Sequence, residues 1–210
     1  MDGKQAGRDR VQLRVIPGGL TPGPIVDDVD DVLRARHGDN AAREALFKRH
    51  LRMLRQRVHR LMGPDPDSED VVQESFLRAF ANLGRLVDPQ AFPAWLSKIA
   101  VHLVNHHLRR RKLLRRLGFQ PGADGAEVMD TVAAPGLSPA VATEARRVYA
   151  LLDDLPAEAR VAFLLRHLEE MTVPEVAAQM GLSERTVKRR VALAEERMAP
   201  FLELDVKERA

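Results

Sequence analysis

The chain alternates between stretches in which hydrophobic residues recur every three or four positions and stretches that lack this pattern. The periodic stretches run from about residue 26 to 116 and from about residue 140 to 204. Such spacing places apolar side chains on one face of a helix, and no run alternates as a half-buried strand would. The pattern therefore predicts an all-α fold with two small helical domains.

Three segments lie outside this pattern. Residues 1–25 contain the Gly- and Pro-rich run IPGGLTPGP and are expected to form a disordered N-terminal tail. Residues 117–139 have the composition of a flexible linker, and residues 205–210 form a short C-terminal tail. The expected order is tail, helical domain (26–116), linker (117–139), helical domain (140–204) and tail.

Composition excludes several kinds of site. The 210 residues include no cysteine, which rules out disulfides, zinc–thiolate centres and cysteine nucleophiles. The net charge of +3 is modest, but most of the 33 basic residues are arginines, which suit bidentate contacts with phosphate and guanine. No apolar run approaches the roughly 18 residues of a membrane span, and no signal peptide precedes the first domain. We therefore expect a cytoplasmic protein.

The clearest local motif covers residues 172–198, TVPEVAAQMGLSERTVKRRVALAEERM. Thr172 and Glu175 have the spacing of a capping box, and Gly181 suits the left-handed residue that ends a helix. A second helix then has one apolar stripe and a basic opposite side. Two such helices can belong to an ordinary bundle, but they are typical of a helix-turn-helix, whose second helix enters the major groove of DNA. Its basic side, with Arg185, Lys188 and Arg189, is the side predicted to face DNA.

A helix predicted over residues 67–83 has two unlike faces. One face is apolar and belongs to the core. The other combines acids, an amide and an exposed leucine, namely Asp70, Gln73, Glu74 and Leu77. An acidic face repels DNA phosphates, so we interpret it as a surface for docking a protein. An ordinary solvated face with a single leucine is the alternative.

A long helix predicted over residues 91–116 ends in a basic cluster. Such a cluster attracts DNA phosphates and releases their counterions, although cations also collect at helix C-termini because of the helix dipole. The cluster contains Arg109, Arg110, Arg111 and Lys112.

Two histidines in the same helix, His102 and His106, have the i, i+4 spacing of two metal ligands. No third ligand stands at a diagnostic spacing, so we predict no metal site. We interpret both as hydrogen-bonded histidines on the inner side of the helix, which they would share with Trp95 and Ile99.

Three segments, taken together and in order, resemble a known family. DSEDVVQESFLRAF, FPAWLSKIAVHLVNHHLRRRK and LPAEARVAFLLRHLEEMTVPEVAAQMGLSERTVKRR are similar to bacterial RNA polymerase sigma factors of the sigma-70 family, in particular the small extracytoplasmic-function (ECF) group. The resemblance covers residues 26–112 as family region 2 and 140–200 as region 4. No segment resembles region 3 or the N-terminal autoinhibitory region of housekeeping sigma factors.

The resemblance implies a function and a set of partners. A member would bind core RNA polymerase, direct it to promoter DNA by recognising the −10 and −35 elements, and promote strand opening. It would have no enzymatic activity, no cofactor and no small-molecule substrate. Members are usually held inactive by an anti-sigma factor, often a membrane-bound one.

The resemblance also implies roles for particular residues. The polymerase contact falls on the docking face (Asp70, Gln73, Glu74 and Leu77), and the −35 contact falls on Arg185, Thr186, Lys188 and Arg189. The −10 contact falls on the helix from Phe92 to Lys112, which includes the basic cluster 109–112, and on the loop 84–90, with Val87, Asp88 and Gln90. The loop lacks the family's frequent Gly-x-Ser run, so the base that it would capture stays open, and His102 and His106 replace the family's frequent Asn and Asp.

Two other classes of protein share parts of these motifs. A regulator of the LuxR type would need a sensory or receiver domain, and the first domain shows no βα alternation. A recombinase would need a nucleophile with acid–base partners. The single tyrosine, Tyr149, lies inside an amphipathic helix far from any such cluster.

Overall fold

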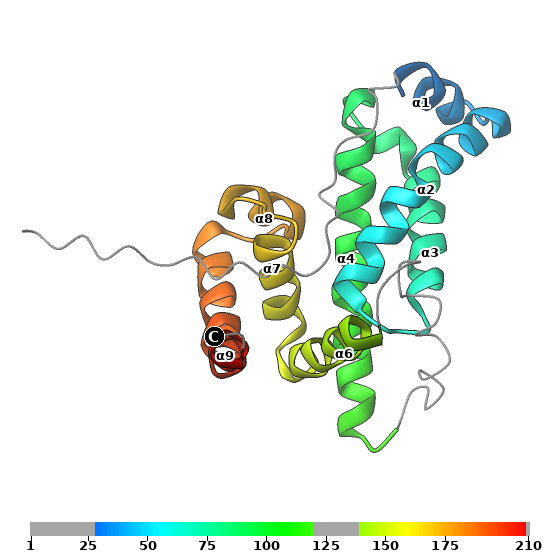
Figure 1. The fold of residues 1–210 in the computed structure, drawn as a ribbon. Coiled ribbons are helices and arrows are strands. Elements are labelled where there is room, and N and C mark those ends of the chain that lie inside the picture. The colour runs from blue at the N-terminus through cyan, green and yellow to red at the C-terminus, as the bar shows by residue number, and fades with distance from the viewer. Residues whose placement is uncertain (1–27, 120–138, 209–210) are drawn as a thin grey trace, which may run out of the picture.

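The computed structural model describes residues 28–119 and 139–208, and every regular element in these ranges is helical. The helices form two groups that lie side by side (Figure 1). The N-terminal group contains α1 (Val29–Arg36), α2 (Asn40–Met62), α3 (Ser68–Ala81), the 3-10 helices η1 (Leu83–Arg85) and η2 (Pro89–Ala91), and α4 (Phe92–Arg116). The C-terminal group contains α6 (Pro139–Asp154), α7 (Ala157–His167), α8 (Val173–Met180) and α9 (Glu184–Glu208). The predicted all-α fold is confirmed.

Some of the sequence-based expectations concern segments outside these ranges. The predicted disordered tail and residues 120–138 of the predicted linker lie outside the described residues. Residues 117–119 directly follow α4, and α9 continues to Glu208. None of the described helices combines the length and the apolarity that a membrane crossing needs.

The N-terminal group is built around α2, α3 and α4, which pack pairwise. Asp39 begins α2, because its side chain accepts hydrogen bonds from the backbone N–H groups of Ala41 and Ala42. The predicted apolar face of α3 is confirmed, since Val72 and Phe76 are buried and the ring of Phe76 lies 4.7 Å from that of Phe47. This packing turns the opposite face of α3 outward.

The helix-turn-helix has the local geometry that its sequence predicts. Thr172 and Glu175 form a reciprocal capping box at the start of α8, and Gly181 ends α8 in the left-handed conformation with φ 65°. The Ser183 hydroxyl accepts a hydrogen bond of 3.3 Å from the backbone N–H of Thr186 at the start of α9. The apolar stripe of α9 is buried, as predicted, at Val187, Val191, Ala194 and Met198.

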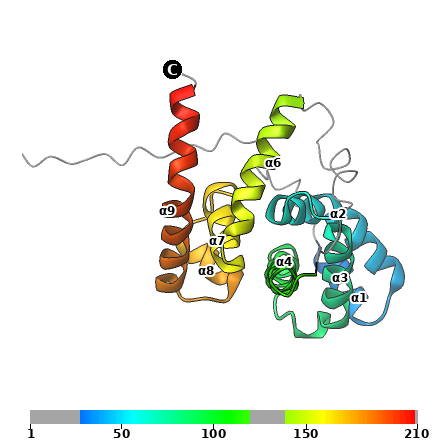
Figure 2. The same ribbon diagram turned by 90° about the horizontal axis from the view of Figure 1, so that it is seen from below.

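The two groups meet along a seam in which α7 contacts α2 and α4, and α8 contacts α4. Figure 2 shows α7 between α9 and the N-terminal group. Arg160 of α7 is only 2% exposed at this seam. Its guanidinium donates to the backbone oxygens of Leu61 and Met62, which end α2. The sequence analysis did not predict this contact between the groups.

Candidate nucleic-acid and protein interfaces

The outer face of α3 carries the four residues of the predicted docking face. Asp70 and Gln73 are exposed, and the Leu77 side chain is an apolar group that is 65% exposed. Glu74 is partly covered and forms a 2.6 Å ion pair with Arg78, one turn further along the helix. The structure therefore presents an acidic surface with an apolar centre and with one of its acids already paired.

The loop between α3 and α4 holds an exposed apolar side chain in a fixed backbone. Leu86 is buried, whereas Val87 is 95% exposed. The carboxylate of Asp88 accepts a 3.0 Å hydrogen bond from the backbone N–H of Gln90 and thereby caps the start of η2. Arg36 of α1 donates to the backbone oxygens of Leu83 and Leu86. Sequence reasoning missed Arg36, because no local pattern connects it with a loop about fifty residues away.

The basic end of α4 differs from the free cluster that the sequence suggested. Arg109 pairs with Glu158 of α7 at 3.1 Å, and Arg111 pairs with Asp153 of α6 at 3.2 Å. Together with Lys112, three of the four predicted cations therefore have a partner in the C-terminal group.

The third engaged cation is Lys112, whose ammonium donates to the backbone oxygens of Asp154 (2.8 Å) and Leu155 (3.0 Å). Burial and the charge of Arg116 lower the pKa of Lys112. Arg110 is exposed, and no described residue pairs with it. The C-terminal group thus satisfies most of this cluster.

The outer side of α9 is exposed to solvent and carries cations that can contact a ligand. Arg185, Lys188 and Arg189 are exposed, and none of them has an ion-pair partner within the described ranges. The Thr186 hydroxyl lies 2.9 Å from that of Ser183, so Thr186 also holds the start of the helix. Because Val187 and Val191 anchor the buried side, the three cations project away from the core.

The two histidines of α4 do not lie where the sequence analysis placed them. Both His102 and His106 are exposed, and the buried positions of α4 include Ala100, Leu103 and Val104 instead. The inner-side interpretation was therefore wrong. The His102 ring contacts the turn before α9, because its Cε1 lies 3.5 Å from where a side chain at Gly181 would begin.

The environment of His102 disfavours the charged imidazolium. Burial lowers its pKa, and the positive charges of Lys98 and Arg109 lower it further. The described residues place no third metal-ligating group beside His102 and His106.

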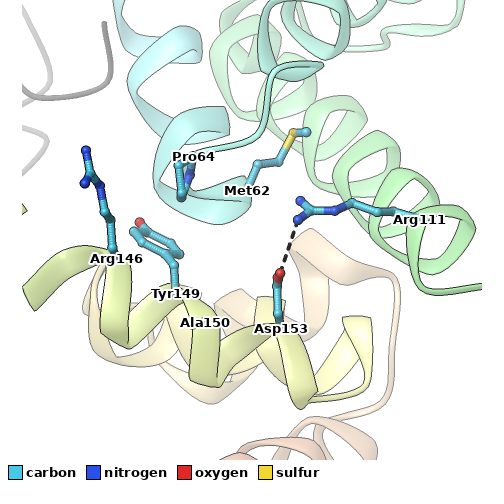
Figure 3. Close-up of a pocket in the computed structure, with 7 residues that line it drawn as sticks. All are labelled: Met62, Pro64, Arg111, Arg146, Tyr149, Ala150 and Asp153. Carbon is cyan, nitrogen blue, oxygen red and sulfur yellow. Dashed lines mark hydrogen bonds and ion pairs between the residues drawn. The ribbon is translucent and has the colours of Figure 1, made fainter. Parts of the chain in front are cut away.

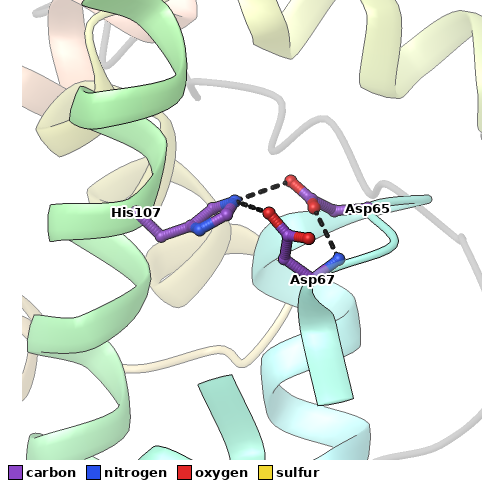
Figure 4. Close-up of side chains that lie close together, drawn as sticks. All are labelled: Asp65, Asp67 and His107. Carbon is purple, nitrogen blue, oxygen red and sulfur yellow. Dashed lines mark hydrogen bonds and ion pairs between the residues drawn. The ribbon is translucent and has the colours of Figure 1, made fainter. Parts of the chain in front are cut away.

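A different cluster joins the loop after α2 to α4 (Figure 4). Asp65 is 1% exposed, and its Oδ2 lies 3.1 Å from His107 Nε2 and 2.5 Å from an Arg111 nitrogen. Asp67 is also near His107, at 3.8 Å. Because Arg111 supplies a cation to Asp65, these side chains form an ion-paired network in this structure.

The charge of Asp65 is strongly stabilised. Burial alone would raise the pKa of this carboxyl. Hydrogen bonding to His107, the charges of His107 and Arg111, and the backbone N–H of Asp67 outweigh burial and lower the pKa to about 2. The network thereby fixes the entry to α3, and with it the docking face, relative to α4.

These features define a helical protein with an acidic docking face, an exposed apolar loop and a helix-turn-helix with unpaired cations. Comparison with known proteins gives the family. The sequence pattern of sigma-70 region 2 matches residues 46–114, and that of sigma-70 region 4 matches residues 145–198. The chain belongs to the sigma-70 family, in its ECF group.

Named relatives agree with this assignment. The RNA polymerase sigma factor NccH of Alcaligenes xylosoxydans xylosoxydans is 28% identical over 83% of this chain and 95% of its own length. The ECF RNA polymerase sigma factor SigM of Mycobacterium tuberculosis (strain H37Rv) is 30% identical over 82% of this chain and 84% of its own length.

A solved structure extends the comparison to the fold. The RNA polymerase sigma factor CnrH of Cupriavidus metallidurans is 30% identical over 85% of this chain and 97% of its own length. The structure of CnrH in complex with the cytosolic domain of CnrY covers 85% of this chain and 98% of that chain, with a TM-score of 0.54 and 27% identity. The chain is thus a non-enzymatic, promoter-specific initiation factor for RNA polymerase, as its family defines.

Proposed function

We propose that this sigma factor divides its tasks between the two groups of helices. The N-terminal group, as region 2, binds core polymerase and the −10 element, and the C-terminal group, as region 4, binds the −35 element. Two exposed surfaces of opposite charge carry this proposal. The acidic face of α3 suits a basic protein surface, whereas the unpaired cations of α9 suit phosphates and guanine edges.

Within region 2, Asp70, Gln73, Glu74 and Leu77 dock on polymerase. An exposed leucine inside a polar surface is the arrangement expected of a small interface core surrounded by a polar rim. The loop with Val87, Asp88 and Gln90 then faces the −10 element. Its anchored backbone presents these side chains at little entropic cost, because the loop is already ordered by Arg36 and by the η2 cap.

Partners beyond polymerase and promoter follow from the relatives. CnrH is named in complex with the cytosolic domain of CnrY. We infer that this chain is likewise held by an anti-sigma factor, which would be membrane-bound if its sigma-binding part is a cytosolic domain as in CnrY. Because its polymerase and promoter lie in the cytoplasm, we assign the chain to that compartment.

The docking assignment is tested by the double substitution Asp70→Lys with Glu74→Lys. Binding to purified core polymerase is measured by a fluorescence titration, and we expect at least a tenfold loss of affinity. The matched control is Asp30→Lys with Glu44→Lys, which makes the same charge change at exposed positions of α1 and α2. Equal losses in both proteins would refute the docking assignment, and no binding of the unchanged protein to core would refute the proposed function.

The −35 assignment is tested by Arg185→Ala in a promoter-selection assay. If Arg185 reads a base, preference at one position should relax by about 1–3 kcal/mol. Arg197→Ala is the matched control, because Arg197 is an exposed arginine more than three turns further along α9. An unchanged preference with a smaller salt dependence would make Arg185 a phosphate contact instead.

A further inference from the structure

One group of described side chains brings together three ligand atoms of the kinds that bind transition metals. The group contains Asp65 and Asp67, from the loop between α2 and α3, and His107 of α4 (Figure 4). One carboxylate oxygen from each aspartate and one ring nitrogen of the histidine lie within 4.8 Å of one another. Because His107 is 42 positions from Asp65, only the folded chain assembles this group.

The spacing of these atoms matches the ligand shell of a small divalent cation. His107 Nε2 lies 3.1 Å from Asp65 Oδ2 and 3.8 Å from Asp67 Oδ2. Zn²⁺ binds nitrogen and carboxylate oxygen at about 2.0–2.2 Å, so two such ligands stand roughly 3.0 Å apart at a right angle and roughly 3.4 Å apart at the tetrahedral angle. The first distance falls within this range. The Asp67 side chain, which is 55% exposed, can close the second distance by a small rotation.

The loop holds Asp65 in the orientation that a metal ligand needs. Its Oδ1 accepts a 3.1 Å hydrogen bond from the backbone N–H of Asp67, which leaves Oδ2 facing His107. The backbone N–H of Asp65 donates to the backbone oxygen of Gly63 at 2.8 Å, and the Ser68 hydroxyl donates to the backbone oxygen of Asp65 at 2.7 Å. Hydrogen bonds of this kind orient metal ligands from outside the coordination shell. Asp65 therefore offers Oδ2 without a further loss of side-chain freedom.

Arg111 supplies the positive charge next to Asp65 in this structure, and it has a second acid to pair with. One of its nitrogens lies 2.5 Å from Asp65 Oδ2, and another lies 3.2 Å from Asp153 of α6 (Figure 3). When a metal cation replaces the guanidinium beside Asp65, Arg111 keeps Asp153 as its partner. No buried charge is then left without a counterion, which is the condition that makes such an exchange inexpensive.

We propose that Asp65, Asp67 and His107 form a binding site for a late first-row divalent cation such as Zn²⁺, with water completing its coordination. One imidazole and two carboxylates suit Zn²⁺, Ni²⁺ or Co²⁺ better than Ca²⁺ or Mg²⁺, which prefer shells of oxygen atoms alone. The bound cation ties the start of α3 to α4, because Asp67 directly precedes α3. None of the three ligands belongs to the proposed polymerase or promoter contacts, so the site is separate from them.

Zinc binding is measured by isothermal titration calorimetry on the full chain, produced without a histidine tag and treated with a chelator. We expect one equivalent of Zn²⁺ to bind. Asp67→Asn should weaken the affinity at least tenfold, because it removes a charged ligand from an exposed position without changing the size of the side chain. Asp30→Asn is the matched control, because it removes the charge of an aspartate of α1 that is 81% exposed. Equal affinities of the two variants, or no saturation at up to about 1 mM Zn²⁺, would overturn the proposal.

The histidine ligand is tested by a second matched pair. His107→Gln should abolish zinc binding, whereas His106→Gln changes the exposed neighbouring histidine and should leave the affinity unchanged. The opposite result, with binding lost in His106→Gln and kept in His107→Gln, would assign the metal to the i, i+4 pair of His102 and His106 and overturn the proposal.

A stability measurement detects the site in the native fold. A cation that binds only the folded chain raises its stability, so saturating Zn²⁺ should raise the urea midpoint of the unchanged protein and of Asp30→Asn. It should not raise the midpoint of Asp67→Asn. The unchanged sequence serves as its own reference here, with and without chelator, so the result does not depend on whether His107→Gln folds. A midpoint that zinc leaves unchanged in the unchanged protein would contradict the site.

Discussion

Replacing Asp65 by asparagine removes the charge at the centre of the network that joins the loop after α2 to α4. The carboxylate lies 3.1 Å from His107 Nε2 and 2.5 Å from an Arg111 nitrogen. It also accepts a 3.1 Å hydrogen bond from the backbone N–H of Asp67. Asparagine keeps the size of the side chain, so the substitution isolates the effect of the charge.

The pKa of Asp65 gives the magnitude. Its folded-state value is about 2, against an ordinary value of 3.8. At 1.36 kcal/mol per pKa unit, the charged form adds about 2 kcal/mol to the free energy of unfolding. Because the folded-state pKa is the lower one, this contribution is complete above about pH 5. It shrinks as pH falls below the unfolded value, is about half present at pH 3, and vanishes below about pH 2.

The assay is urea unfolding, followed by circular dichroism, at pH 7 and at pH 3. Asp65→Asn should lower the free energy of unfolding by about 2 kcal/mol at pH 7 and by about half as much at pH 3. Asp67→Asn is the matched control, because its side chain is 55% exposed and 3.8 Å from His107, and it should change stability by less than about 0.5 kcal/mol. Equal effects of the two substitutions, or a difference independent of pH, would refute the network.

Three further substitutions test other parts of the fold by the same unfolding measurement at pH 7. Thr172→Ala removes the capping box of α8 and should cost about 1 kcal/mol, and no loss would contradict the cap. Glu170→Gly should raise the free energy of unfolding by up to about 1 kcal/mol, because Glu170 has φ 55°, a left-handed backbone conformation that glycine adopts without strain. A lower free energy of unfolding would show that contacts of the Glu170 side chain outweigh this backbone strain. Glu169→Gln should cost at least 3 kcal/mol, since it leaves Arg57 without its anion in a buried site, and a smaller cost would mean that water reaches this pair.

The features that could be predicted from the sequence are those in which cause and effect lie within one or two helical turns. The capping box, the left-handed Gly181 and the buried stripe of α9 depend on residues three to seven positions apart, and each is confirmed. The exposed face of α3 also follows from local spacing, because the opposite face is so clearly apolar. The roles assigned to these faces remain predictions.

The features that could not be predicted depend on contacts between distant residues. Arg111 meets Asp65 across 46 positions, and Arg160 meets Leu61 across 99. The misplaced histidines have the same origin. A helix such as α4, which packs against α2 and α3 on one side and α7 and α8 on another, has no single inner stripe. The face of α4 that carries Trp95 and Ile99 is only half-buried, so the histidines that share this face by spacing are exposed.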